Sequence, residues 1–111
     1  MHRVASELNG ARAVVVASGE LDAYAAPDLE RELATVRGKR AVIVDLSQAS
    51  FLDSTALGLV VRATRELEED GTAVRVVLPQ GTARRIFEIT ALDRVLPTAS
   101  TRQAGLGELD S

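Results

Sequence analysis

Stretches with helical spacing of apolar residues alternate along the chain with short, continuously apolar stretches. The helical spacing is clear over about residues 27–38, 54–70 and 82–92, and each stretch predicts an amphipathic helix. Residues 41–46 and 73–79 are apolar almost throughout and rich in β-branched side chains, as is typical of strands covered on both faces. This alternation indicates an α/β fold in which helices pack on a sheet.

An Asn-Gly pair near the N-terminus predicts a hairpin. Asn9-Gly10 separates the segments RVASEL and ARAVVVASG, and Asn-Gly favours the positive φ angles of a type I′ turn. An antiparallel hairpin followed by alternating helices and strands indicates one mixed sheet.

The pattern after the second buried strand is weaker. Thr82 is expected to cap the third helix, and RVLP at 94–97 resembles a short strand. Residues 100–111 are expected to form a weak helix or a tail, because Gly105 and Gly107 disfavour a helix.

The stretch FLDSTALGLV, residues 51–60, places three cap-type residues, Asp53, Ser54 and Thr55, before a helix. A count of about 100° per residue puts Gly58 on the solvent side, one turn after Ser54. A second group faces the sheet, and its members are Ala56, Leu57, Leu59, Val60, Ala63, Thr64 and Leu67. Glycine costs on the order of 1 kcal/mol in a helix, but it leaves bare backbone where another protein could approach Ser54.

Two interpretations of these hydroxyls are open from the residues alone. Asp53 as helix cap, with neutral Ser54 and Thr55 in the first turn, is an ordinary helix start. Alternatively Ser54 is modified, since no base lies near it in the sequence to make it a nucleophile. A phosphate there would carry about −1.5 to −2 charges and would displace a partner docked on the serine.

Composition and charge exclude several classes of function. The 111 residues are enough for one core, and the net charge of −3 argues against nucleic-acid binding. The chain has no cysteine, and its one histidine, His2, is terminal, which argues against a catalytic triad and a His or Cys metal site. With neither a signal peptide nor a membrane span in the sequence, a cytoplasmic location is expected.

Two separated segments resemble the STAS domain of bacterial anti-sigma factor antagonists. VDLSQASFLDSTALGLV is similar to that family's signature, D-L-S followed by a loop, an aromatic, an aliphatic residue and D-S-[ST]-G-L-G. GELDAYAAPDL is similar to its Gly-Glu-Leu-Asp segment. The resemblance runs from about residue 4 to about 96, so the chain is expected to be a single STAS domain over 1–111.

The resemblance implies a four- or five-stranded mixed sheet with helices mainly on one face. It also implies an anti-sigma factor antagonist, not an enzyme, that needs no cofactor. The unphosphorylated form would bind an anti-sigma factor, commonly a serine kinase whose substrate is ATP, and so free the sigma factor. Phosphorylation would release the antagonist, and a serine phosphatase would reset the cycle, with no nucleic acid or membrane partner.

Site residues follow from this resemblance position by position. The phosphoacceptor maps onto Ser54, with Thr55 a distant alternative, and Asp53 would cap the helix and orient its loop. Asp22, from Glu20-Leu21-Asp22, is either a partner contact or a solvated turn residue. Gly58 and Arg62, on the exposed side of the helix, would complete the partner surface.

The chain departs from the family pattern at Ala56, where glycine is usual. The helical count buries this methyl group against the sheet. Two other functions stay open: a non-switching STAS scaffold or accessory subunit of a signalling or transport complex, and a small enzyme. The intact D-S-T motif argues against the first, and the absence of a Gly-rich phosphate loop argues against the second.

Overall fold

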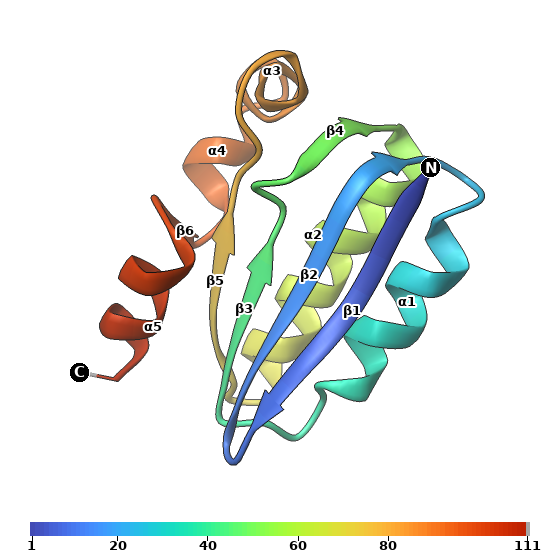
Figure 1. Cartoon of the computed structure of the whole chain (residues 1–111). Coiled ribbons are helices and arrows are strands. Elements are labelled where there is room, and N and C mark those ends of the chain that lie inside the picture. Colours follow the sequence, from blue (N-terminus) through green and yellow to red (C-terminus); the bar gives the residue numbers. More distant parts are fainter. Residues whose placement is uncertain (111) are drawn as a thin grey trace.

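The computed structural model describes residues 1–110 and forms a twisted mixed sheet flanked by helices (Figure 1). Residue 111, the end of the expected C-terminal segment, lies outside the described residues. The elements in chain order are β1 (His2–Asn9), β2 (Arg12–Leu21), α1 (Ala26–Thr35), β3 (Ala41–Asp45), β4 (Ala49–Leu52), α2 (Ser54–Glu69), β5 (Ala73–Val77), α3 (Thr82–Ile89), α4 (Leu92–Val95), β6 (Thr98–Ala99) and α5 (Arg102–Leu109).

The sheet confirms the mixed α/β class. Its strand order is β1-β2-β3-β5-β6, and β4 pairs with β2 off this path. β1 and β2 are antiparallel, whereas every other pair is parallel. Within residues 1–110 the sheet has six strands, more than the expected four or five, because the short strands β4 and β6 join it.

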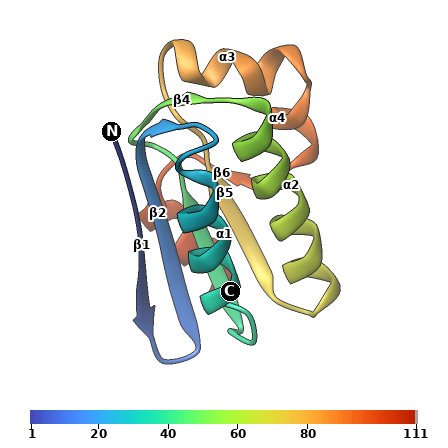
Figure 2. The ribbon, with the colours of Figure 1, turned by 90° about the vertical axis from the view of Figure 1, so that its right-hand side faces the viewer.

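Helices cover both faces of the sheet unequally. α1 and α2 lie together on one face, and α5 lies on the other (Figures 1 and 2). The larger core cluster lies under α1 and α2, and the smaller one, built on Val14, Ile43 and Val77, is covered by Leu106 and Leu109 of α5. All five residues of β3 are buried, as its continuous apolar pattern predicts.

The hairpin forms, but its turn is shifted by one residue from the expected Asn9-Gly10. Asn9 pairs with Arg12, so the two loop residues are Gly10 and Ala11. Only the first of them has a positive φ, 62° at Gly10, which is the pattern of a type II′ turn and not of type I′. Gly10 therefore supplies the left-handed conformation from the first loop position.

The region after β5 differs most from expectation. Gly81, not Thr82, occupies the N-cap of α3, and no side chain caps this helix. α3 stops at Ile89 because Ala91 adopts a left-handed conformation with φ 59°. The RVLP segment is therefore no strand: its first two residues end α4, and the short strand β6 follows at Thr98–Ala99.

The weakly predicted C-terminal helix forms as α5. The Thr101 hydroxyl caps it by accepting the amide of Ala104 at 3.0 Å. Gly105 is buried, and a Cβ built there would lie 2.8 Å from Ile43 Cδ1. The glycine that disfavours a helix in isolation thus allows α5 to lie close against the sheet.

Candidate functional site

The segment between β3 and α2 contains a short strand, β4, that the sequence pattern did not predict. It runs parallel to the end of β2, with Phe51 opposite Glu20 and Leu52 opposite Leu21. Gly19 pairs with Ala49, so Ser50 is the extra residue of a bulge. Only the two end residues of β4 are buried. A strand buried in this way gives the sequence neither an alternating pattern nor a continuous apolar run, so it was not predicted.

β4 delivers the chain to the N-terminus of α2 at the edge of the sheet (Figure 2). Asp53 has extended backbone, and its Oδ1 accepts the amide of Ala56 at 2.9 Å. This confirms that Asp53 is the helix cap. Ser54 and Thr55 are the first two helical residues, and both are exposed.

The exposed side of α2 has the expected composition. Gly58 is exposed, as are Arg62 and Arg65, whereas the expected sheet-facing residues are buried except Ala63, which is half-buried. Nothing lies within 4 Å of a Cβ built on Gly58. Arg62 lies one turn further along, where it lines an open groove of about 200 Å³ between α1 and α2.

Asp22 and Asp53 lie in adjacent loops. The amide of Asp53 donates to the carbonyl of Leu21 at 3.1 Å, so the residue after β2 and the cap of α2 are neighbours. Asp22 Oδ1 accepts the amides of Tyr24 at 3.0 Å and Ala25 at 3.2 Å. The carboxylate therefore stabilises the turn that leads into α1, a role between the two expected alternatives of partner contact and solvated turn residue.

Two aromatic side chains beside these loops were not predicted as site residues. Tyr24 is 88% exposed and Phe51 is 49% exposed, although large apolar side chains are usually buried. The signal available in the sequence was their position, since each lies within two or three residues of an expected contact, Asp22 or Ser54. Exposed aromatics are the side chains that most often anchor a protein interface.

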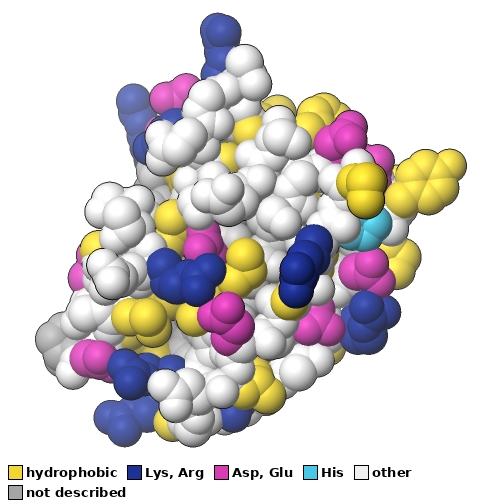
Figure 3. Space-filling model, viewed as in Figure 1, with side chains coloured by type: hydrophobic (Ala, Val, Ile, Leu, Met, Phe, Trp, Pro, Cys, Tyr) yellow, Lys and Arg dark blue, Asp and Glu magenta, His cyan; other side chains and the backbone are white. Residues whose placement is uncertain are grey.

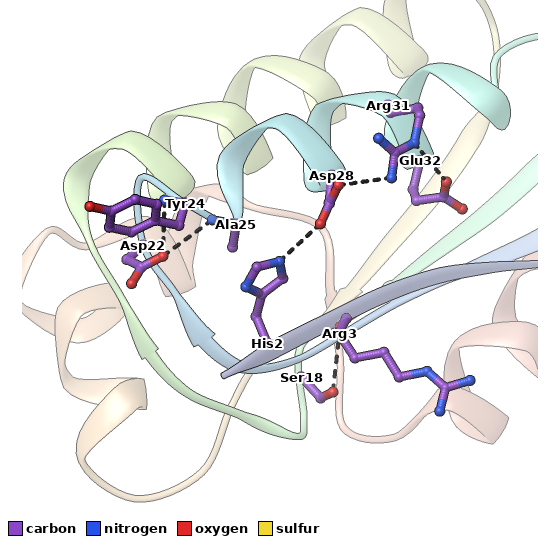
Figure 4. A network of polar contacts seen from close by, with 9 residues as sticks. All are labelled: His2, Arg3, Ser18, Asp22, Tyr24, Ala25, Asp28, Arg31 and Glu32. Carbon is purple, nitrogen blue, oxygen red and sulfur yellow. Dashed lines mark hydrogen bonds and ion pairs between the residues drawn. The ribbon is translucent and has the colours of Figure 1, made fainter.

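A polar network fixes the start of β1 against α1 near the same surface (Figure 4). His2 Nε2 lies 2.9 Å from Asp28 Oδ2, and Arg31 donates to Asp28 Oδ1 at 2.8 Å. The hydrogen bond from His2, and then that from Arg31, lower the pKa of the Asp28 carboxyl below its usual value. The only histidine of the chain thus has a structural contact.

The described part of the chain has no group of three or more His, Cys, Asp or Glu side chains that could hold a metal ion. Over the same residues, none of the helices has the length and apolar character needed to cross a membrane. What the surface at the ends of β2 and β4 does present is an exposed hydroxyl on a capped helix, two acidic loops and two exposed aromatics. Such a surface suits protein binding.

Comparison with known proteins decides the family. Residues 3–105 match the family model of the STAS domain. The chain belongs to the STAS domain family. The match extends beyond the expected residue 96 and includes the first half of α5.

Several proteins that this STAS protein is similar to are named anti-sigma factor antagonists. It is 38% identical over 80 residues to the anti-sigma-B factor antagonist of Staphylococcus aureus, covering 70% of this chain and 74% of that one. The crystal structure of an anti-sigma factor antagonist from Mycobacterium paratuberculosis superposes with a TM-score of 0.88 at 30% identity, covering 100% of this chain and 96% of the other. The unphosphorylated form of the antagonist SpoIIAA superposes with a TM-score of 0.61 at 26% identity, over 86% and 97% of the two chains.

The first residue of the STAS signature, Asp45, has an internal role. Its side chain is 6% exposed, and its Oδ2 accepts from Arg102 Nε at 3.0 Å. Its Oδ1 accepts the amide of Ser47 at 2.9 Å. Arg102 also donates to Glu7 at 3.1 Å, so this residue joins β1, β3 and the start of α5.

The departure at Ala56 is also internal. Ala56 is fully buried, and its amide donates to the Asp53 cap. Its methyl group therefore packs toward the sheet and does not cover Ser54, as the helical count predicts.

Proposed function

We propose that this STAS protein is an anti-sigma factor antagonist whose binding is controlled at Ser54. One observation carries the proposal: the serine of the signature is exposed at the first position of a capped helix, in a chain similar to named anti-sigma factor antagonists. The binding surface comprises Asp22, Asp53, Ser54, Thr55, Gly58 and Arg62. The surface is centred on Ser54, beside the adjacent loops that contain Asp22 and Asp53.

The helix N-terminus supports the placement of a phosphate on Ser54. The first amides of a helix have no acceptor within the helix, and Asp53 takes up the amide of Ala56. The amides of Ser54 and Thr55 and the helix dipole would stabilise the dianion. The same charge would repel an acidic partner, and the phosphate group would be costly to bury in a closely packed interface. Phosphorylation would therefore prevent partner binding without unfolding the domain.

The proposed partners follow from the resemblance to anti-sigma factor antagonists. The anti-sigma factor is proposed to be a serine kinase that transfers phosphate from its own ATP to Ser54. A serine phosphatase would restore the hydroxyl, and the chain itself needs no cofactor. The whole of 1–111 is proposed to act as one STAS domain in a cytoplasmic complex.

The proposal is tested with Ser54 variants and the co-purified anti-sigma factor. Ser54→Ala should keep full affinity and accept no phosphate, whereas Ser54→Asp should weaken binding by at least about tenfold, because like charges across an interface are costly. Thr55→Ala is the matched control and should be phosphorylated as the wild type is. Titration calorimetry measures the affinities, and intact-protein mass spectrometry measures the phosphate.

Two results would reject this function. Equal affinities for wild type and Ser54→Asp would show that charge at Ser54 controls nothing. Recovery of transport subunits and no anti-sigma factor would favour the non-switching STAS module.

A further inference from the structure

β1 forms a long, open edge of the sheet. It spans eight residues, His2–Asn9, and within the described residues it pairs with β2 alone, whereas β6 at the other end of the sheet has two residues. In the view of the helix face, no other element of the described chain lies beyond β1 (Figure 2). An uncovered edge of this length presents a row of unpaired backbone groups.

The alternation of the ladder shows which backbone groups are free. The carbonyl of Met1 accepts the amide of Glu20 at 3.0 Å, so the odd-numbered residues of β1 direct their amides and carbonyls toward β2. The even-numbered residues, His2, Val4, Ser6 and Leu8, therefore direct theirs outward. A strand laid against this edge would bond to these four.

The edge has neither a bulge nor a proline, and its two charged side chains, Arg3 and Glu7, are of opposite sign. The register of β1 with β2 is continuous from His2 to Asn9, without a bulge, and β1 contains no proline. None of the four even-numbered side chains is an Asp, Glu, Lys or Arg, and Leu8 is 54% exposed. Natural edge strands are commonly protected by bulges, prolines or charges of this kind.

The charges that β1 does carry are complementary to a second copy of themselves. Arg3 and Glu7 both lie on the α5 face, opposite to His2, as Figure 4 shows for Arg3, and as the Glu7–Arg102 contact requires. In an antiparallel pair centred on Ala5, Arg3 of each copy lies opposite Glu7 of the other. Basic and acidic side chains are interspersed over the surrounding surface, with no single sign dominating (Figure 3).

The hydrogen-bonding pattern agrees with the same register. Centring on Ala5 places Val4 opposite Ser6 and His2 opposite Leu8, and all four are outward-directed. These are hydrogen-bonded pairs, and Ala5 meets Ala5 in a non-hydrogen-bonded pair on the two-fold axis. Charge and backbone direction thus select one register.

We propose that β1 is a homodimer interface, in which two copies pair their β1 strands antiparallel about Ala5 and form one continuous sheet. The interface is isologous, since each copy offers the same edge. It includes none of the residues of the proposed antagonist surface, so the dimer does not rest on the proposed function.

A single cysteine tests the register, and the chain has no cysteine of its own. Across a non-hydrogen-bonded pair the two Ala5 Cα atoms would be about 4.5 Å apart, within the range of a disulfide. Ala5→Cys should therefore form a covalent dimer under mild oxidation. Leu8→Cys is the matched control: it is exposed on the same strand, but its two copies would be separated by about 20 Å along the ladder, and it should stay monomeric on a non-reducing gel.

Charge variants test the interface in solution by sedimentation equilibrium. The wild-type mass should rise with concentration toward twice that of the monomer. Arg3→Glu, which has no ion pair to lose within residues 1–110, should raise the dissociation constant about tenfold, because two attractive pairs become repulsive. A mixture of Arg3→Glu and Glu7→Arg chains should recover the dimer as a heterodimer.

Three outcomes would overturn the proposal. The first is a wild-type protein that stays monomeric up to about 1 mM, a dissociation constant equivalent to a binding free energy of only about 4 kcal/mol. The β1 edge would then be unpaired or bound by a different protein. Equal cross-linking of Ala5→Cys and Leu8→Cys would indicate random collision. Weaker cross-linking of Ala5→Cys after Ser54→Asp would show that the dimer uses the antagonist surface instead.

Discussion

Gly58 shows how one residue can favour function over stability. It lies inside α2, one turn after the helix start, where glycine is a poor choice, yet a Cβ there would meet nothing within 4 Å among the described residues. No packing reason for glycine exists inside the described molecule. The open space above it, one turn from exposed Ser54, is what a partner would use.

Gly58→Ala should therefore stabilise the free protein and weaken partner binding. The expected gain is up to about 1 kcal/mol in the free energy of unfolding, the difference in helix propensity, measured by urea denaturation. Affinity for the anti-sigma factor should fall, measured by calorimetry. Arg65→Ala, also exposed on α2 but further from Ser54, is the control, and equal affinities for Gly58→Ala and wild type would remove Gly58 from the partner surface.

α5 shows how an element can form against its local sequence preference. Two of its eight residues are glycine, and each costs on the order of 1 kcal/mol relative to alanine. The helix is held by the Thr101 cap and by Leu106 and Leu109, which cover the small cluster of Val14, Ile43 and Val77. Tertiary packing thus outweighs propensity.

The two glycines of α5 should respond oppositely to alanine. Gly107→Ala meets nothing within 4 Å among residues 1–110 and should stabilise the fold by up to about 1 kcal/mol. Gly105→Ala places a methyl group 2.8 Å from Ile43 Cδ1 and 3.2 Å from Ala99 Cβ, so overpacking should cost about 1–3 kcal/mol. Thermal unfolding of the matched pair measures both, and an equal gain from both substitutions would contradict the close packing of α5.

At the scale of the whole molecule, Arg102 joins segments that are far apart in the sequence. It contacts Asp45 and Glu7, which lie 57 and 95 residues away. Asp45 is nearly buried, and a buried carboxylate without a partner is costly. The signature aspartate therefore holds the sheet, the turn at Ser47 and α5 together.

Arg102→Ala should destabilise the protein by about 2 kcal/mol, less than for a fully buried pair because Arg102 itself is partly exposed. Arg12→Ala, which removes the exposed pair with Asp110, is the control and should cost at most about 1 kcal/mol. Urea denaturation compares the two. Similar small losses would show that Asp45 finds enough water to replace its partner.

Local chemistry explains which expectations were accurate. Asp53 caps α2, the stripe from Ala56 to Leu67 is buried except for the half-buried Ala63, and β3 lies inside the sheet, because caps and periodicity act over a few residues. The turn at Gly10-Ala11 and the end of α3 at Ile89, before the left-handed Ala91, depend on small differences in backbone conformation. Neighbouring residues did not indicate either one.

The sequence by itself determined the α/β class, the main helices and strands and the exposed serine at a helix start, since these depend on periodicity and on side-chain chemistry within single segments. Only the tertiary structure decided that β4 pairs with the end of β2, that Asp22 and Asp53 become neighbours, and that Arg102 neutralises Asp45. Each of these depends on contacts between distant segments, and such contacts exist only once the sheet has assembled.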